Sequence, residues 1–185
     1  MSINSLDLRN SPLIEVLAKS TAAAGIMLGA CNTVDGLGAQ IFRHTGRSLM
    51  NSTPRPISRG IHQFFGQTLA PINQYFERRN PLVGRIIAAP ILEELVFRGT
   101  QTLLLPHIMG LVSRIALSSL FFNFAHNEAQ PGKNLVLLFV GIILGCLAEW
   151  NESILRGILT AILAHAIFNT LITYIYVQIL KIGIK

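Results

Sequence analysis

Two adjacent carboxylates and an arginine stand inside a stretch of aliphatic residues. The segment 85–105 is mostly Ile, Leu, Ala and Val, but it contains Glu93, Glu94 and Arg98. On insertion scales an ionised side chain near the centre of a bilayer costs roughly 2.5–3.5 kcal/mol. The favourable insertion free energy of the aliphatic neighbours does not offset three such charges. A helix of this kind needs polar partners from other helices. Ionisable residues inside a membrane segment are candidates for a functional site.

The spacing of these charges predicts different roles for the two carboxylates. Glu94 and Arg98 are four residues apart on one helical face, with the acid N-terminal to the base, which favours an ion pair. Glu93 is turned by about 100° from Glu94 and is not committed to that arginine. We therefore predict a supporting Glu94–Arg98 pair and a free Glu93 carboxylate. Pro90 cannot donate a helical hydrogen bond and predicts a bend close to these residues.

Two further polar sets lie on apolar segments, one containing Asn123 and His126 and the other His165 and Asn169. A lone histidine in a membrane helix is more often a packed residue than a catalyst. Two histidines, an asparagine and a spare glutamate on three segments instead indicate one site. Glu93 would act as general base on a water oriented by His126. His165 and Asn169, one helical turn apart, would donate hydrogen bonds to an oxyanion.

A zinc site is the competing interpretation of the same residues. Glu93, His126 and His165 would be three ligands, with an open fourth position for a water molecule. The sequence contains no HExxH motif, so ligand spacing gives the metal no support. We therefore favour the glutamate mechanism without a cofactor and keep zinc as the alternative.

The segments that carry these residues predict an all-α polytopic membrane helix bundle with four to five spanning helices. Half of the residues, 51%, are hydrophobic and only 13% are charged, against about a quarter in soluble domains. The apolar segments are separated by turn-forming residues at Pro106, 130–133 and 151–153. They cover approximately 83–105, 108–126, 135–150 and 154–180. Gly141 and Gly145 form a GxxxG pair that indicates close helix packing or a chance occurrence.

The first half of the chain is predicted with less detail. Residues 12–31 are either a fifth spanning helix or a helix on the membrane surface, and the sequence leaves both open. Residues 61–76 have apolar side chains at helical spacing and arginines on both flanks, which is typical of an interfacial helix or of an amphipathic helix packed on the bundle. We divide the chain into an N-terminal region, 1–80, and a core, 81–185.

Charge predicts the orientation and the partners. The net charge is +6, and most arginines precede the first core helix. Beside so much apolar sequence, they indicate the cytoplasmic flank of a multi-pass integral membrane protein rather than nucleic-acid binding. The opposite loops carry Glu149 and Glu152 against a single Arg156. The site would therefore open toward the cytoplasmic leaflet, and the expected partners are membrane lipid and a membrane-associated peptide or protein.

Three sequence stretches resemble a known family. EELVFR, FNFAH and HAIFN are similar to the EExxxR, FxxxH and HxxxN motifs of the CPBP family, which contains CAAX prenyl endopeptidases and bacteriocin-processing proteins. The resemblance covers residues 93–169 in the family's order. It implies an intramembrane endopeptidase in which Glu93, His126, His165 and Asn169 are catalytic, with Glu94 and Arg98 in supporting roles. It also implies substrates with peptide bonds near a membrane surface, including prenylated CAAX-type tails.

Two other functions fit the same residues. A non-catalytic membrane protein, such as a bacteriocin immunity factor or a scaffold, could keep the polar groups for helix association. Proton-coupled transport could use buried glutamate and histidine side chains as a relay, although the sequence shows no inverted repeat of the kind common in transporters. Intramembrane proteolysis is the function that we predict.

Overall fold

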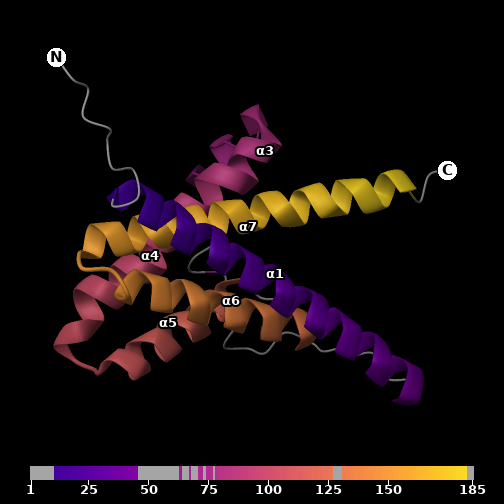
Figure 1. Cartoon of the computed structure of the whole chain (residues 1–185), viewed down its shortest axis with the longest axis horizontal. Helices are drawn as coiled ribbons and strands as arrows, with labels where there is room; N and C mark the ends of the chain where they lie inside the picture. Colours follow the sequence, from indigo (N-terminus) through magenta and orange to yellow (C-terminus); the bar gives the residue numbers. More distant parts are fainter. Residues whose placement is uncertain are drawn as a thin grey trace, which may run out of the picture.

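The computed structural model is helical, and no strand occurs among the residues that it describes (Figure 1). Those residues are 11–45, 63, 67, 71, 72, 74–76, 78–126 and 131–182. Its helices are α1 (Pro12–Thr45), α3 (Pro81–Val83), α4 (Ala89–Gly99), α5 (Leu111–His126), α6 (Pro131–Glu149) and α7 (Ile154–Ile182). The all-α prediction is confirmed. The helix predicted over 61–76 falls largely outside the described residues.

Two helices are long and apolar enough to cross a membrane. They are Pro12–Thr33 within α1 and Ile154–Ile175 within α7, and Asn134–Glu149 in α6 is a shorter apolar stretch. This is consistent with the predicted helical membrane bundle. The total of four to five spanning helices stays a prediction, because α4 carries three charges and α5 has only 16 residues.

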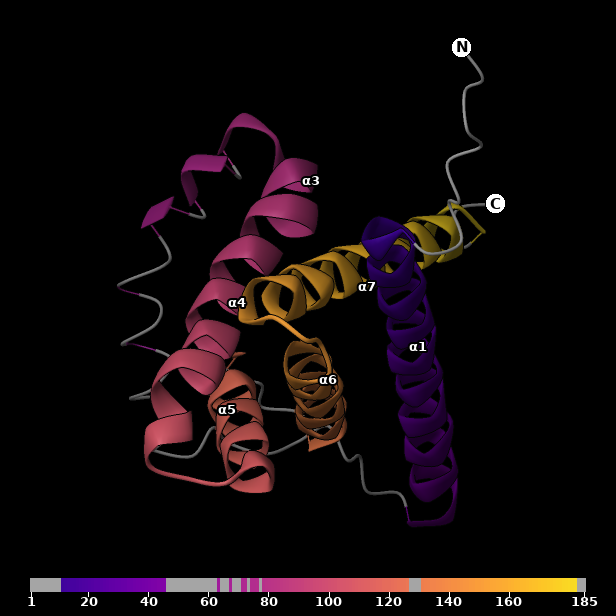
Figure 2. The same cartoon turned by 60° about the vertical axis from the view of Figure 1, so that its left-hand side comes forward.

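The first helix is packed against the rest of the bundle. Figure 1 shows α1 and α7 crossing each other, and Figure 2 shows α1 on the far side of α6 and α7 from α4. The Ser20 hydroxyl donates a hydrogen bond to the backbone carbonyl of Thr160 at 3.0 Å, and both side chains are fully buried. Ala24 and Met27 join the same apolar core as Leu144 of α6. The packing and the length of α1 favour the spanning alternative for residues 12–31; the division of the chain at residue 80 stays a prediction.

α4 lies in a nearly continuous helical run that contains two π-helical turns. These are Gly84–Ala88 before α4 and Thr100–Leu104 after it, and a 3-10 turn ends the run at Leu105–His107. A π turn adds one residue between hydrogen-bonded groups and is often found at functional sites. The run as a whole confirms the predicted helical segment and its end near Pro106.

Pro90 explains the first π turn. The Ala89 N–H bonds to the carbonyl of Gly84, five residues back, and the next bond in this register would need an N–H on Pro90. Proline has none, so the carbonyl of Arg85 is left without its helical partner. The irregularity predicted near Pro90 is therefore a π turn that frees one backbone acceptor.

The GxxxG pair lies where α6 packs closely against α5. A Cβ atom on Gly141 would lie 3.0 Å from the Cα of Ser119, and one on Gly145 would lie 3.1 Å from Ile115. The glycines therefore permit this packing, and the chance interpretation is wrong.

The predicted turn at 130–133 is corrected by the structure, because α6 begins at Pro131. Proline is well suited to the first turn of a helix, where its missing N–H is not needed. The turn predicted at 151–153 is confirmed, since these residues form the bend between α6 and α7.

Candidate active site

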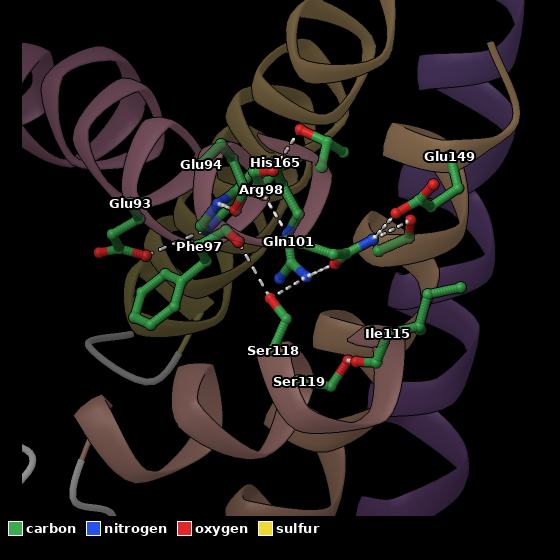
Figure 3. A network of polar contacts seen from close by, with 12 residues as sticks. Glu93, Glu94, Phe97, Arg98, Gln101, Ile115, Ser118, Ser119, Glu149 and His165 are labelled. Atoms are coloured by element: carbon green, nitrogen blue, oxygen red, sulfur yellow. Dashed lines mark hydrogen bonds and ion pairs between the residues drawn. The ribbon is translucent and has the colours of Figure 1, made fainter. Parts of the chain in front are cut away.

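The polar residues of α4, α5 and α7 meet where these three helices pack together (Figure 3). Glu93, Glu94 and Arg98 come from α4, His126 from α5 and His165 from α7. Glu94 and Arg98 are fully buried, and His165 is 5% exposed. Residues separated by more than 70 positions in the sequence thus share one site.

Glu94 contacts an arginine and a histidine at once. Its Oε2 accepts a hydrogen bond from Arg98 Nε at 2.8 Å, and its Oε1 lies 2.8 Å from His165 Nδ1. The predicted ion pair is confirmed. A carboxylate is acceptor-only when ionised, so the Nδ1 of His165 carries a proton that points at Glu94. This contact fixes the ring, and its Nε2 faces the other way, toward Glu93.

Arg98 continues the contacts away from the histidine. Its Nη1 donates to Gln101 Oε1 at 2.9 Å and to the Ser118 hydroxyl at 3.0 Å, and that hydroxyl donates to the carbonyl of Phe97 at 3.1 Å. Nη2 has no hydrogen-bond partner among the described residues. The guanidinium carbon lies 5.7 Å from the centre of the Phe122 ring. Arg98 is thus held by three polar groups and one aromatic ring.

Gln101 connects Arg98 to the end of α6 by hydrogen bonds. Its Nε2 donates to the backbone carbonyl of Gly145 at 3.0 Å and to Glu149 Oε1 at 3.1 Å, and Arg114 Nε donates to the same oxygen at 2.7 Å. The sequence interpretation of Glu149 as a loop charge is wrong, because it is the last residue of α6 and pairs with Arg114 of α5. We refer to these connected side chains as the buried network. It consists of His165, Glu94, Arg98, Gln101, Ser118, Glu149 and Arg114.

Glu93 lies between the two histidines and outside the buried network. Its Oε2 is 3.6 Å from His126 Nε2 and 3.9 Å from His165 Nε2, and no hydrogen bond reaches this buried oxygen from the described residues. His126 Nδ1 is 2.8 Å from the carbonyl of Phe122, which can only accept, so Nδ1 bears the proton. In the neutral ring the Nε2 that faces Glu93 is then an acceptor.

Phe122 packs between the functional side chains and is 1% exposed. Its ring centre lies 4.5 Å from that of His126 and 5.8 Å from that of His165. Phe97 meets it edge-on at 5.4 Å. The aromatic ring therefore limits the positions that both imidazoles can take.

Asn169 makes a contact that the sequence did not predict, and its predicted role as an oxyanion donor stays a prediction. Its Nδ2 donates to the backbone carbonyl of Arg85 at 3.0 Å, the acceptor that Pro90 leaves free. Among the described residues, its hydrogen bond joins α7 to the π turn before α4 and does not reach Glu93 or a histidine. The second N–H of the same amide is still available to a ligand.

The zinc alternative finds no support in this geometry. Among the described residues, no group of three His, Cys, Asp or Glu side chains is arranged to hold a metal ion. The prediction of no cofactor stays a prediction.

The chain matches a family of known proteins. The family model of Rce1-like type II CAAX prenyl endopeptidases matches residues 80–171, which is about half of the sequence. The match begins at the N-cap of α3 and includes all of the predicted site residues. No curated protein and no solved structure matches the chain.

Proposed function

Since this chain belongs to the Rce1-like family of type II CAAX prenyl endopeptidases, we propose that it is an intramembrane endopeptidase that hydrolyses its substrate with a water activated by Glu93. The family and the apolar helices make it an integral membrane protein. We infer that its substrate is a membrane-associated peptide or protein, such as a prenylated CAAX-type tail, and that the site opens toward the cytoplasmic leaflet.

The observation that carries the proposal is the pair of acceptors formed by Glu93 and His126. A carboxylate oxygen and an unprotonated imidazole nitrogen 3.6 Å apart share no proton of their own. A water molecule between them can donate one hydrogen to each, which turns an oxygen lone pair toward a bound carbonyl. In this mechanism Glu93 takes the proton as the water attacks.

The attack converts the peptide carbonyl into a tetrahedral oxyanion, which needs hydrogen-bond donors. In its protonated form His165 donates from Nδ1 to Glu94 and from Nε2 into the site. The free N–H of Asn169 is a second donor. Collapse of the intermediate breaks the C–N bond, and Glu93 returns its proton to the leaving amine.

Cleavage by the purified full chain tests the proposal. The substrates are membrane-anchored peptides, including prenylated CAAX tails, each incubated with and without a metal chelator. We expect wild type to cleave in both conditions, and Glu93→Gln to lose about 10²–10⁴-fold in kcat with unchanged thermal unfolding. Glu152→Gln is the matched control, because its side chain is 92% exposed and distant in sequence from the site residues of α4.

Three results would contradict the glutamate mechanism. Loss of wild-type cleavage in chelator would move the chemistry to a metal ion. Full activity of Glu93→Gln would remove the assigned base. A folded wild-type protein that cleaves no peptide would favour a non-catalytic immunity or scaffold role.

A further inference from the structure

A cavity of about 280 Å³ lies outside the candidate active site and is lined by Gln74, Arg78, Pro81 and Arg85. It forms where the chain changes direction at Asn80. The backbone of Asn80 is extended, and its side chain accepts hydrogen bonds from the N–H groups of the next turn. Gln74 and Arg78 therefore line the cavity from before this junction, and Pro81 and Arg85 line it from after it.

Two of the four lining residues are arginines, and none is acidic. Neither Arg78 nor Arg85 forms an ion pair within the described part of the chain. The neighbouring Arg79 does not line the cavity, and its guanidinium carbon lies 4.8 Å from the centre of the Tyr75 ring. A guanidinium group presents a planar fork of N–H donors that suits a phosphate, and two arginines at one cavity can bind the same phosphate.

Exposed apolar side chains lie on both sides of the same junction. Ile72 and Phe76 are 46% and 39% exposed before it, and Leu82 and Val83 are 56% and 36% exposed after it. A soluble phosphate ion would gain nothing from these groups. Acyl chains below a phosphate would cover them, as expected for a protein that lies in a bilayer.

We propose that this cavity binds the phosphate of an anionic phospholipid, with Arg78 and Arg85 as its ligands and the acyl chains against the apolar side chains of the junction. Basic pockets on membrane proteins bind anionic headgroups in this way. The site would place Arg85 at the headgroup level and Glu93, eight residues further along the helical run, about 12 Å deeper. It would also lie next to the carbonyl that holds Asn169.

Binding of short-chain lipids to the full chain in mild detergent tests the proposal, and it does not depend on any proteolytic activity. The probes are dioctanoyl phosphatidylglycerol, dioctanoyl phosphatidylcholine and glycerol phosphate, titrated and counted by native mass spectrometry. We expect saturable binding of phosphatidylglycerol to wild type and weaker binding of both other probes. Arg78→Gln and Arg85→Gln are each expected to weaken phosphatidylglycerol about fivefold.

Arg79→Gln is the matched control, since it removes the same charge from an adjacent position whose guanidinium stacks on Tyr75. We expect it to bind phosphatidylglycerol as wild type does. An equal loss of phosphatidylglycerol affinity in Arg79→Gln would show that binding comes from diffuse electrostatic attraction, and it would overturn the proposed site. Equal binding of phosphatidylcholine, or of glycerol phosphate without acyl chains, would also overturn it. Displacement of phosphatidylglycerol by a peptide acid, but not by its amide, would assign the cavity to a substrate carboxylate instead.

Discussion

Glu93 and Glu94 are neighbours in sequence, yet their surroundings are opposite. Glu94 is fully buried, and its two oxygens contact Arg98 and His165 at 2.8 Å. Glu93 is 22% exposed, and its Oε2 lies more than 3.5 Å from either histidine. Both oxygens of Glu94 already have partners in a site closed to water, whereas Oε2 of Glu93 accepts no hydrogen bond from the described residues and is open to a water molecule. The comparison therefore separates a group that holds the site from a group that can react.

His165 joins the two regions, because Nδ1 contacts Glu94 and Nε2 faces Glu93. The buried network can thus influence the reaction through the position and protonation of this ring. Substitutions in the network should change stability first and turnover second. Substitution of Glu93 should do the reverse.

Loss of Glu94 should have the largest effect on stability. Glu94→Leu leaves Arg98 buried without its carboxylate, and breaking a buried ion pair from one side costs about 3–5 kcal/mol. We expect a large fall in the thermal unfolding temperature in detergent, or failure to accumulate in the membrane. Glu93→Leu is the comparison variant and should unfold at the wild-type temperature. Equal destabilisation by both would remove the distinction between the two carboxylates.

Substitution of Gln101 should have the next largest effect on stability, because the Gln101 amide joins Arg98 to Glu149. Gln101→Met keeps the length of the side chain. It removes the hydrogen bond that Gln101 accepts from Arg98 and the two that it donates to Gly145 and Glu149 of α6. Loss of partners in a buried site costs about 1–3 kcal/mol. If Gln101 acts through Arg98 on Glu94 and His165, kcat should fall while KM stays near the wild-type value.

A conservative variant separates positioning from general packing at this residue. Gln101→Glu would bring a carboxylate to within hydrogen-bonding distance of Glu149 Oε1, where Gln101 now donates at 3.1 Å. It should be destabilised, and Glu149→Gln in the same chain should restore part of the loss. If Glu149→Gln restores no stability to Gln101→Glu, the contact between Gln101 and Glu149 contributes no coupling free energy.

The sequence was sufficient to predict the local part of the site but not the connections between helices. The Glu94–Arg98 pair follows from i,i+4 spacing, and Gln101 at the next i,i+3 position extends that face. This spacing was a usable signal for Gln101, although its partner Glu149 lies 48 residues away and no local rule relates them. Similarly, the predicted role of Asn169 did not include the carbonyl of Arg85, because that acceptor is created by Pro90 through a π turn. The family resemblance placed both histidines at the site, and the contact distances come only from the fold.

The smallest expected effects concern the two glycines of α6, and they differ because their neighbours differ. A Cβ on Gly141 would meet the backbone of Ser119 at 3.0 Å, whereas a Cβ on Gly145 would meet the side chains of Gln101 at 3.0 Å and Arg98 at 3.2 Å. Backbone cannot yield without moving α5, so Gly141→Ala should lose about 1–3 kcal/mol of stability as an overpacked site. Side chains can shift by a few tenths of an ångström, so Gly145→Ala should cost less stability. It should nevertheless lower kcat, because the groups that yield belong to the buried network. Thermal unfolding and turnover measured on both variants check this. A Gly145→Ala enzyme with wild-type kcat would show that displacement of Arg98 and Gln101 does not affect His165.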